Sequence, residues 1–409
     1  MKLHYKKSIT KKINASPDAI VALLFIAHIL SAICSDILLP ALKQMQSELG
    51  STEFMTQMSI IIFYAGAIVS RTVWGAVSDI YGRKTAFIWA IAIQTVTIFP
   101  CVYAENIETI ILCRFLQSFG SGFISVICIA IVADLFIEKD RPPVYALIDS
   151  SYPIGFVLGP VIGAVVSDYF GWQGCFWFIF YSFSLIFIAV LIILPETNKD
   201  RTKNSFKKVY KDYFKFFKNR RMLECGAIIG LISGAYMAFV IHAPYIYMCN
   251  NNLSKLEFAF FQMTPMVVSF FALLLYRKLV YKHGIAYCLN LGMKGMLIMT
   301  VLSSLINFLS SPISPFVSLF IVTGYCSFSQ FIVPSLTSKA LEVFPQRSGM
   351  SSSVLSSLRS MFMLLCMLVT GYFVASEAKQ IFNSISVIIM LTMFLLLSML
   401  NRYVKIEDK

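Results

Sequence analysis

Two ionisable residues lie inside long apolar segments of this sequence, where charge is costly. Asp36 falls in the apolar segment 18–42 and Arg114 in the segment 108–135. An arginine within a membrane helix costs roughly 3 kcal/mol on insertion scales, so it usually faces a cavity and a partner. A carboxyl group beside it can bind and release a proton, because desolvation favours the neutral acid and a guanidinium favours the carboxylate. We predict that Asp36 and Arg114 form a proton-binding site; the alternative is that Asp36 only neutralises Arg114.

The segments that hold these two residues are predicted to cross a membrane. The chain has 409 residues, of which 58% are hydrophobic and 13% charged, and its mean hydropathy is +0.75. A soluble protein of this length has too little interior for so many apolar side chains. Apolar runs of about 20 residues cross a bilayer as helices, because a helix satisfies its backbone hydrogen bonds within its own segment. The sequence therefore predicts an integral, helical membrane protein.

Twelve such segments are predicted, which gives an all-α membrane protein with two six-helix bundles. The bundles cover residues 18–195 and 222–402, and the cytoplasmic tails are residues 1–17 and 403–409. The linker 196–221 has aromatic residues at helical spacing among lysines, which indicates an amphipathic helix on the membrane surface. The predicted spans are 18–42, 54–78, 85–104, 108–135, 144–167, 173–195, 222–247, 258–280, 285–308, 313–337, 350–373 and 380–402.

The distribution of basic residues predicts the orientation. Of the 34 Lys and Arg residues, 27 lie in the tails, in the loops on their side or at the adjoining ends of spans, three lie in the opposite loops and four lie deeper inside spans. Cytoplasmic loops carry the excess of basic residues, so both termini are expected in the cytoplasm. Asp36 and Arg114 then lie at similar depth below the outer ends of their spans. Pairing of the two is therefore geometrically reasonable.

A charged turn joins the second and third predicted spans. It contains Gly75, Asp79, Gly82, Arg83 and Lys84 in the spacing G-x-x-x-D-x-x-G-R-K. This spacing resembles the signature of the same loop in the major facilitator superfamily of transporters. The resemblance implies the major facilitator fold, with two bundles around a midplane cavity that opens to each side in turn.

Two further motifs resemble that superfamily. Arg114 and Gln117 begin an R-x-x-Q pattern in span four, and Asp134 ends that span close to where Arg83 is expected. The resemblance implies that Asp134 and the loop charges form a latch at the inner surface, and Asp79 is expected to meet the start of span eleven. Span five contains a pattern linked to antiporters, which we interpret as a packing seam and hinge: Gly155, Gly159, Pro160 and Gly163.

The ends of three spans resemble the Bcr/CflA drug-efflux branch of the superfamily. They are Ser35–Leu42, Leu194–Thr197 and His242–Tyr247. The resemblance implies proton-driven antiport of small amphiphilic or anionic compounds out of the cytoplasm, across a bacterial inner membrane. A metabolite or siderophore carrier of the same fold is the alternative. A membrane enzyme or a receptor fits poorly, because the four histidines are dispersed and the chain shows no sizeable soluble domain.

Four polar residues are assigned to the predicted substrate cavity: Arg71, Gln117, His242 and Tyr245. Arg71 departs from the family pattern, where glutamine is usual, and it favours an anionic substrate unless it pairs with a buried acid or extends to the cytoplasm. His242 is alternatively satisfied by local partners. Lys294 and Arg359 are expected to add positive charge to the inner half of the second bundle, which suits an acidic cargo.

No cofactor or metal is predicted. The ten cysteines are scattered singly, and no G-x-x-x-x-G-K-S/T loop for ATP is present. The net charge of +13 lies mainly in loops between spans, which argues against a nucleic-acid partner. The expected partners are protons, a small-molecule substrate and the lipid bilayer, and the protein is expected to be a monomer.

Overall fold

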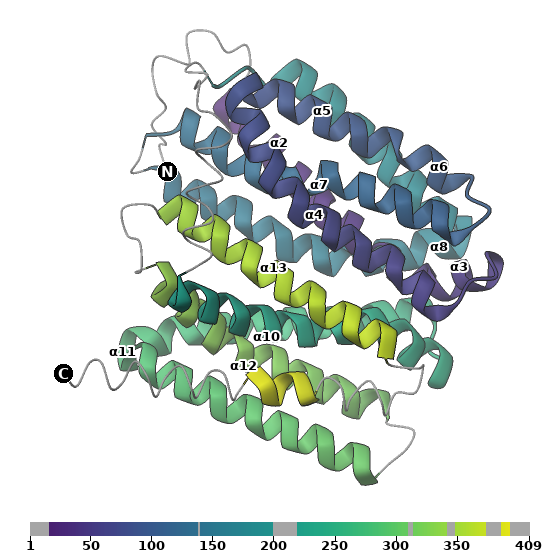
Figure 1. The fold of residues 1–409 in the computed structure, drawn as a ribbon, viewed down its shortest axis with the longest axis vertical. Coiled ribbons are helices and arrows are strands. Elements are labelled where there is room, and N and C mark those ends of the chain that lie inside the picture. Colours follow the sequence, from purple (N-terminus) through teal and green to yellow (C-terminus); the bar gives the residue numbers. More distant parts are fainter. Residues whose placement is uncertain are drawn as a thin grey trace. The chain divides into compact units, whose positions relative to one another are not determined.

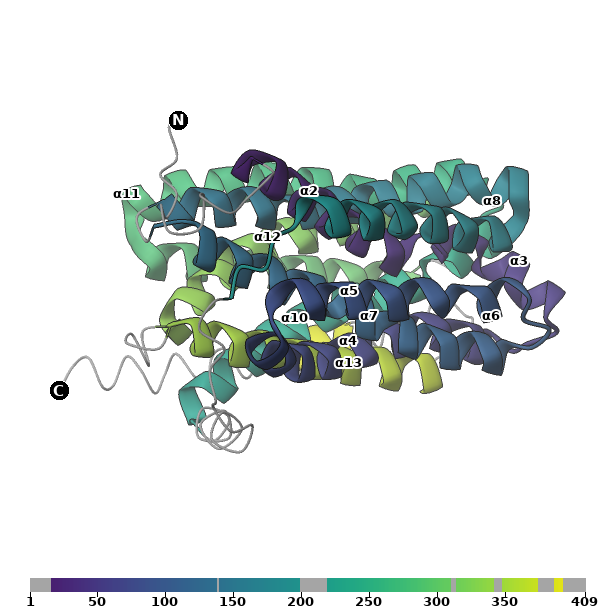
Figure 2. The same ribbon diagram turned by 90° about the horizontal axis from the view of Figure 1, so that it is seen from above.

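The computed structural model describes residues 16–137, 140–198, 219–309, 314–341, 348–373 and 386–392, and this part of the chain is built from helices (Figures 1 and 2). The chain divides into two compact units, Met1–Phe206 and Lys207–Lys409. The predicted amphipathic helix of the linker falls mostly on residues 199–218, outside the described residues.

Three helices of the first unit begin at a residue whose side chain caps the helix. The side-chain oxygens of Ser16, Thr52 and Asn106 accept hydrogen bonds from the backbone N–H groups three residues later, which start α2, α4 and α7. The elements of this unit are α2 (Pro17–Asp36), η1 (Leu39–Ala41), α3 (Leu42–Glu48), α4 (Glu53–Tyr81), α5 (Arg83–Val96), α6 (Ile98–Val102), α7 (Ile107–Leu135) and α8 (Arg141–Ile193).

The second unit follows the same plan. Asn219 caps its first helix by accepting a hydrogen bond from the N–H of Met222. The described elements are α10 (Arg220–Pro244), the π-helical turn η3 (Tyr245–Asn250), α11 (Lys255–Leu309), α12 (Pro315–Leu341) and α13 (Ser348–Phe373).

Nine helices in the described ranges are long and apolar enough to cross a membrane. Two of them, α8 and α11, have 53 and 55 residues, far more than the ~20 that one crossing needs. Each contains a glycine with positive φ and non-helical geometry, Gly171 (φ 67°) and Gly284 (φ 82°), which divides the helix into two crossings. Of the predicted span 380–402 only residues 386–392 are described, so the count of twelve stays a prediction.

Helix pairing repeats between the two units. In the first unit α2 packs on α8, and α4 and α5 pack on α7. In the second unit α10 packs on α13, and α11 packs on α12. Because α8 and α11 each supply two crossings, these are corresponding pairs in two repeats, the internal symmetry common in secondary transporters.

Candidate functional site

The site around Asp36 starts from a break in α2. Pro40 has no N–H to donate, and its ring conflicts with a helical carbonyl four residues earlier, at Asp36. The helix accordingly ends at Asp36, and the chain continues through the short helix η1. The last carbonyl groups of a helix lack partners and form the negative end of its dipole. The sequence thus places a carboxyl group and several unpaired carbonyls at one buried point.

Arg114 of α7 provides the hydrogen bonds that the end of α2 lacks. Its guanidinium donates from Nη1 to the carbonyl of Cys34 (3.1 Å) and from Nη2 to the carbonyl of Ser35 (3.2 Å). It also donates from Nε to the carbonyl of Ser59 on α4 (3.3 Å), and it stacks on the ring of Phe63 at 4.1 Å. Arg114 is completely buried, so its charge is held by helix-end carbonyls and an aromatic face.

Asp36 lies beside this arginine but binds a different group. The hydroxyl of Tyr64 donates to Asp36 Oδ1 at 3.0 Å, and the Asp36 side chain is only 3% exposed. No ion pair between Asp36 and Arg114 occurs among the described residues. The two predicted residues are therefore close neighbours, while the guanidinium contacts the backbone that leads to the acid instead of the acid itself.

Polar residues of three helices complete the cluster. Gln117 Oε1 accepts a hydrogen bond from Arg114 Nη1 at 2.8 Å, which places this predicted cavity residue beside the predicted proton site. Gln94 of α5 donates to the sulfur of Cys34 at 3.6 Å. Tyr64, Gln94 and Cys34 were missed by the sequence analysis. The available signal was that Tyr64 and Gln94 are isolated polar residues in apolar spans.

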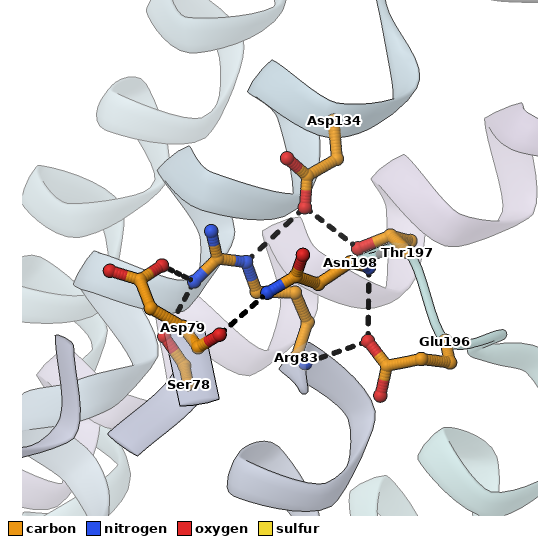
Figure 3. A network of polar contacts seen from close by, with 7 residues as sticks. All are labelled: Ser78, Asp79, Arg83, Asp134, Glu196, Thr197 and Asn198. Atoms are coloured by element: carbon orange, nitrogen blue, oxygen red, sulfur yellow. Dashed lines mark hydrogen bonds and ion pairs between the residues drawn. The ribbon is translucent and has the colours of Figure 1, made fainter. Parts of the chain in front are cut away.

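A second polar network surrounds Arg83 at the turn between α4 and α5 (Figure 3). Arg83 Nη1 donates to Ser78 Oγ (2.7 Å) and to Asp79 Oδ1 (2.5 Å), and Nε donates to Asp134 Oδ2 (3.2 Å). The predicted proximity of Asp134 and Arg83 is thus present in the structure. Nearby, Lys84 Nζ donates to the carbonyl of Leu191 on α8.

The segment after α8 contributes three residues to the same network. Thr197 Oγ1 donates to Asp134 Oδ2 (3.0 Å), and Asn198 Nδ2 donates to the carbonyl of Asp79 (3.0 Å). Glu196 Oε1 accepts from the backbone N–H of Arg83 (2.8 Å) and of Asn198 (3.0 Å). Glu196 therefore caps the N-terminus of α5, where a carboxylate is favoured by the helix dipole. Figure 3 shows these groups converging on the arginine from both sides.

Gly82 makes room for that cap. Its backbone has φ 104° and ψ 155°, a region that essentially only glycine adopts. A β-carbon at this position would also collide with the Glu196 carboxylate. Gly82 is therefore required for two reasons. Its backbone angles exclude other residues, and Glu196 leaves no room for a side chain. Gly75 lies in α4, and the predicted contact between Asp79 and the start of span eleven joins separate units and stays a prediction.

The predicted hinge residues form a close seam between α8 and α2. A β-carbon at Gly155 would lie 2.6 Å from the carbonyl oxygen of Ile29, and one at Gly163 would collide with the carbonyl of Ile37. At Gly159 the nearest atom would be Asp36 Cβ at 3.4 Å, which is tolerable. Pro160 is buried in α8 on the turn that follows. The seam therefore runs directly behind Asp36.

A corresponding seam in the second unit was missed by the sequence analysis. Gly226, Gly230 and Gly234 of α10 recur every four residues and pack against α13. Arg359 of α13 donates a hydrogen bond across this seam to Ser233 at 3.1 Å. Its sequence signal is the same four-residue glycine spacing that marked the first seam.

The remaining predicted cavity residues are distributed over both units. Arg71 is half-buried on α4, and His242 and Tyr245 are buried at the end of α10 and the start of η3. Arg71 belongs to the first unit, and His242 and Tyr245 belong to the second. Their assignment to one cavity stays a prediction.

Comparisons with known proteins fit this architecture. Residues 24–365 match the sequence profile of the Major Facilitator Superfamily. An uncharacterised transporter of Rickettsia bellii is 29% identical over 209 residues, 51% of each chain. The chloramphenicol resistance protein CraA of Acinetobacter baumannii is 25% identical over 228 residues, 56% of this chain and 55% of CraA. The matched regions thus span about half the length of these two relatives.

Two more comparisons extend over most of the chain. A bicyclomycin resistance protein homolog of Haemophilus influenzae is 22% identical over 331 residues, 79% of this chain and 81% of the relative. The xylose transporter XylE of E. coli, in a partially occluded inward-open conformation, superposes with a TM-score of 0.70 over 93% of this chain and 97% of its own, at 12% identity. At that identity the likeness shows the fold alone.

Proposed function

Because this chain belongs to the major facilitator superfamily, whose members are transporters and not enzymes, we propose that it is a proton-coupled antiporter that exports small amphiphilic or anionic compounds by alternating access. The proposed location is a bacterial inner membrane with both termini in the cytoplasm, and the proposed functional unit is a monomer. The excess of basic residues in one set of loops supports this orientation.

The observation that carries the proposal is the buried carboxyl group of Asp36. It is almost inaccessible, it accepts one hydrogen bond from Tyr64, and its neighbouring cation is already bound by carbonyl groups. A carboxylate buried without an ion pair is costly, and proton binding removes that cost. Opening the site to water or moving Arg114 toward the acid would release the proton. Asp36 is thus suited to bind a proton in one conformation and lose it in another.

The seam behind Asp36 supports coupling between the proton and the conformation. Gly159 of α8 lies against Asp36, and close contacts at Gly155 and Gly163 hold the two helices together on both sides. Any change in the tilt of α8 against α2 therefore alters the surroundings of the carboxyl group. In this proposal the antiporter-like motif acts as the hinge that changes the exposure of Asp36.

Two observations support drug-like or anionic cargo. The relatives named as chloramphenicol and bicyclomycin resistance proteins suggest export of small organic compounds. Arg71 adds a positive charge on α4, four residues before Gly75. Arg71, Gln117, His242 and Tyr245 are proposed to contact the substrate, and the half-buried arginine favours compounds that carry a negative charge.

The test uses inside-out membrane vesicles with an acidic interior and a pH-sensitive dye. Cationic, neutral and anionic compounds are added to vesicles that contain wild type, Asp36→Asn, Arg71→Gln or the control Asp18→Asn. The control removes an exposed acid from the other end of α2. We expect some compounds to collapse the gradient in wild type and Asp18→Asn but not in Asp36→Asn, and only anionic responses to be lost in Arg71→Gln.

Two outcomes would overturn parts of the proposal. Full coupling in Asp36→Asn would remove Asp36 as the proton site. A panel in which no compound moves protons would reject drug export and favour a carrier for one specific metabolite or siderophore.

A further inference from the structure

Lys294 lies on an exposed face of α11. It follows the turn at Gly284 by ten residues, about 15 Å of helix. That distance is about half of the ~30 Å hydrocarbon core of a bilayer. The opposite face of this part of α11 packs on α12, through Gly292 and Gly295.

The same face is apolar beyond Lys294. Leu297, Ile298, Val301 and Leu305 are between 50% and 55% exposed and follow Lys294 at helical spacing. Exposed apolar side chains in this stretch of a membrane-spanning helix are expected to contact lipid chains. Lys294 therefore places an ammonium group on a lipid-facing surface, where a charge needs a counter-ion.

Protein side chains in the described part of the chain do not supply that counter-ion. Lys294 makes no hydrogen bond or ion pair there. After Glu257 at its start, α11 contains no Asp or Glu, and α12 contains none at all. An anion from outside these two helices is the remaining way to neutralise the ammonium group.

A row of polar side chains leads from Lys294 to the membrane surface. Asn290 and Tyr287 precede it by four and seven residues and share its face of the helix, and His283 lies just before the break at Gly284. All are exposed, and the rings of His283 and Tyr287 lie against each other in a tilted arrangement, with their centroids 4.7 Å apart. Lys282, also exposed, adds a second cation at the turn.

We propose that this row, from Lys282 to Lys294, binds the phosphate headgroup of an anionic phospholipid. Lys294 attracts the phosphate, Lys282 adds positive charge at the turn, and Asn290 and the Tyr287 hydroxyl provide hydrogen bonds at intermediate depth. A long lysine side chain extends toward the interface, and lipid headgroups deform inward around buried charge, so the two groups approach each other. The face has the charge of a phosphate site and the apolar surroundings of an acyl-chain site, which favours a lipid over a dissolved anion.

The test measures lipid retention by native mass spectrometry of the purified full chain. Phosphatidylglycerol and phosphatidylcholine are offered together to wild type, Lys294→Gln, Lys294→Arg and Lys43→Gln. Lys43 is an exposed lysine of α3 in the other unit, so its variant controls for the loss of one charge. We expect the preference for phosphatidylglycerol to fall about fivefold in Lys294→Gln, equivalent to about 1 kcal/mol, and to be retained in Lys294→Arg and Lys43→Gln.

A second variant keeps both lysines and removes the intermediate hydrogen bonds. Asn290→Leu combined with Tyr287→Phe is expected to weaken the same preference, and it replaces the test if Lys294→Gln fails to fold. Unchanged preference in both variants would overturn the site. An equal loss in Lys43→Gln would show general attraction of anionic lipid and overturn it too. Displacement of phosphatidylglycerol by excess inorganic phosphate would reassign the row to a dissolved anion.

Discussion

Replacing Gly82 by alanine is expected to destabilise the first unit through two separable effects. Holding a non-glycine residue at φ 104° and ψ 155° costs about 1–3 kcal/mol. The added methyl group also displaces the Glu196 carboxylate from the N–H of Arg83, and a hydrogen bond to a charged group contributes about 1.5–3 kcal/mol. Together we expect a loss of about 3–6 kcal/mol in the free energy of unfolding.

The matched control is Gly284→Ala. Gly284 has similar backbone angles (φ 82°, ψ 173°), but no atom lies within 4 Å of the position that a β-carbon would occupy. This variant should show the backbone strain alone, about 1–3 kcal/mol. Unfolding of the purified protein in a detergent mixture, followed by tryptophan fluorescence, compares the two variants.

A double-mutant cycle isolates the contribution of the cap. In a Glu196→Ala background the collision disappears, so Gly82→Ala should cost only as much as Gly284→Ala. If Gly82→Ala remains more costly by the same margin without the Glu196 side chain, the carboxylate does not explain the requirement for glycine and the capping argument is wrong. The cap would also be refuted if Glu196→Ala alone left stability unchanged.

Four further substitutions, in three experiments, test the cluster around Asp36 and the seam behind it. Arg114→Lys should lose at least tenfold in transport rate, because one ammonium group cannot replace a planar guanidinium that serves carbonyls of two helices; wild-type transport would refute this. Gly163→Ala should lower the unfolding free energy by about 1–3 kcal/mol through overpacking against Ile37. Gly159→Ala should cost under about 1 kcal/mol in the same unfolding assay. Equal effects of the two variants would contradict the seam geometry. Tyr64→Phe should reduce gradient collapse in vesicles several-fold while leaving the protein folded, and an unchanged rate would exclude a role of its hydroxyl in proton binding.

The membrane-spanning helices were largely predictable because their signals are local. The span predicted at 108–135 is observed as α7, Ile107–Leu135, where an apolar run follows the capping residue Asn106. The breaks at Gly171 and Gly284 fall between the predicted spans of α8 and α11. Hydropathy and capping act over a few residues, so one sequence suffices to locate them.

The partner of Arg114 was harder to predict, because depth in the membrane does not determine which atoms meet. The sequence placed Asp36 and Arg114 at similar depth, and the structure brings them into one cluster. The guanidinium nevertheless binds carbonyl groups that are available only because α2 stops before Pro40. The proline was visible in the sequence, but its consequence depends on which helix packs beside the break.

The role of Glu196 was not predictable from local pattern at all. It meets Arg83 across 113 positions of sequence, and nothing in the residues around Leu194–Thr197 indicates that their acid caps another helix. Such a contact is determined by the way in which α8 returns to the end of α4.

The two polar clusters of the first unit are joined by the same pair of helices. Tyr64 and Asp79 lie on α4, and Arg114 and Asp134 lie on α7. Arg114 and Asp134 are 20 residues apart, which is about 30 Å along α7. Between the clusters, a β-carbon at Gly122 would lie 2.8 Å from the Cα of Ala67, so the two helices are in close backbone contact there. A hydrogen bond from Ser70 to the carbonyl of Phe119 further fixes their register. Movement at the Asp36 end is therefore expected to reach the Arg83 network by tilting α4 and α7 together, and sliding of one helix past the other is disfavoured.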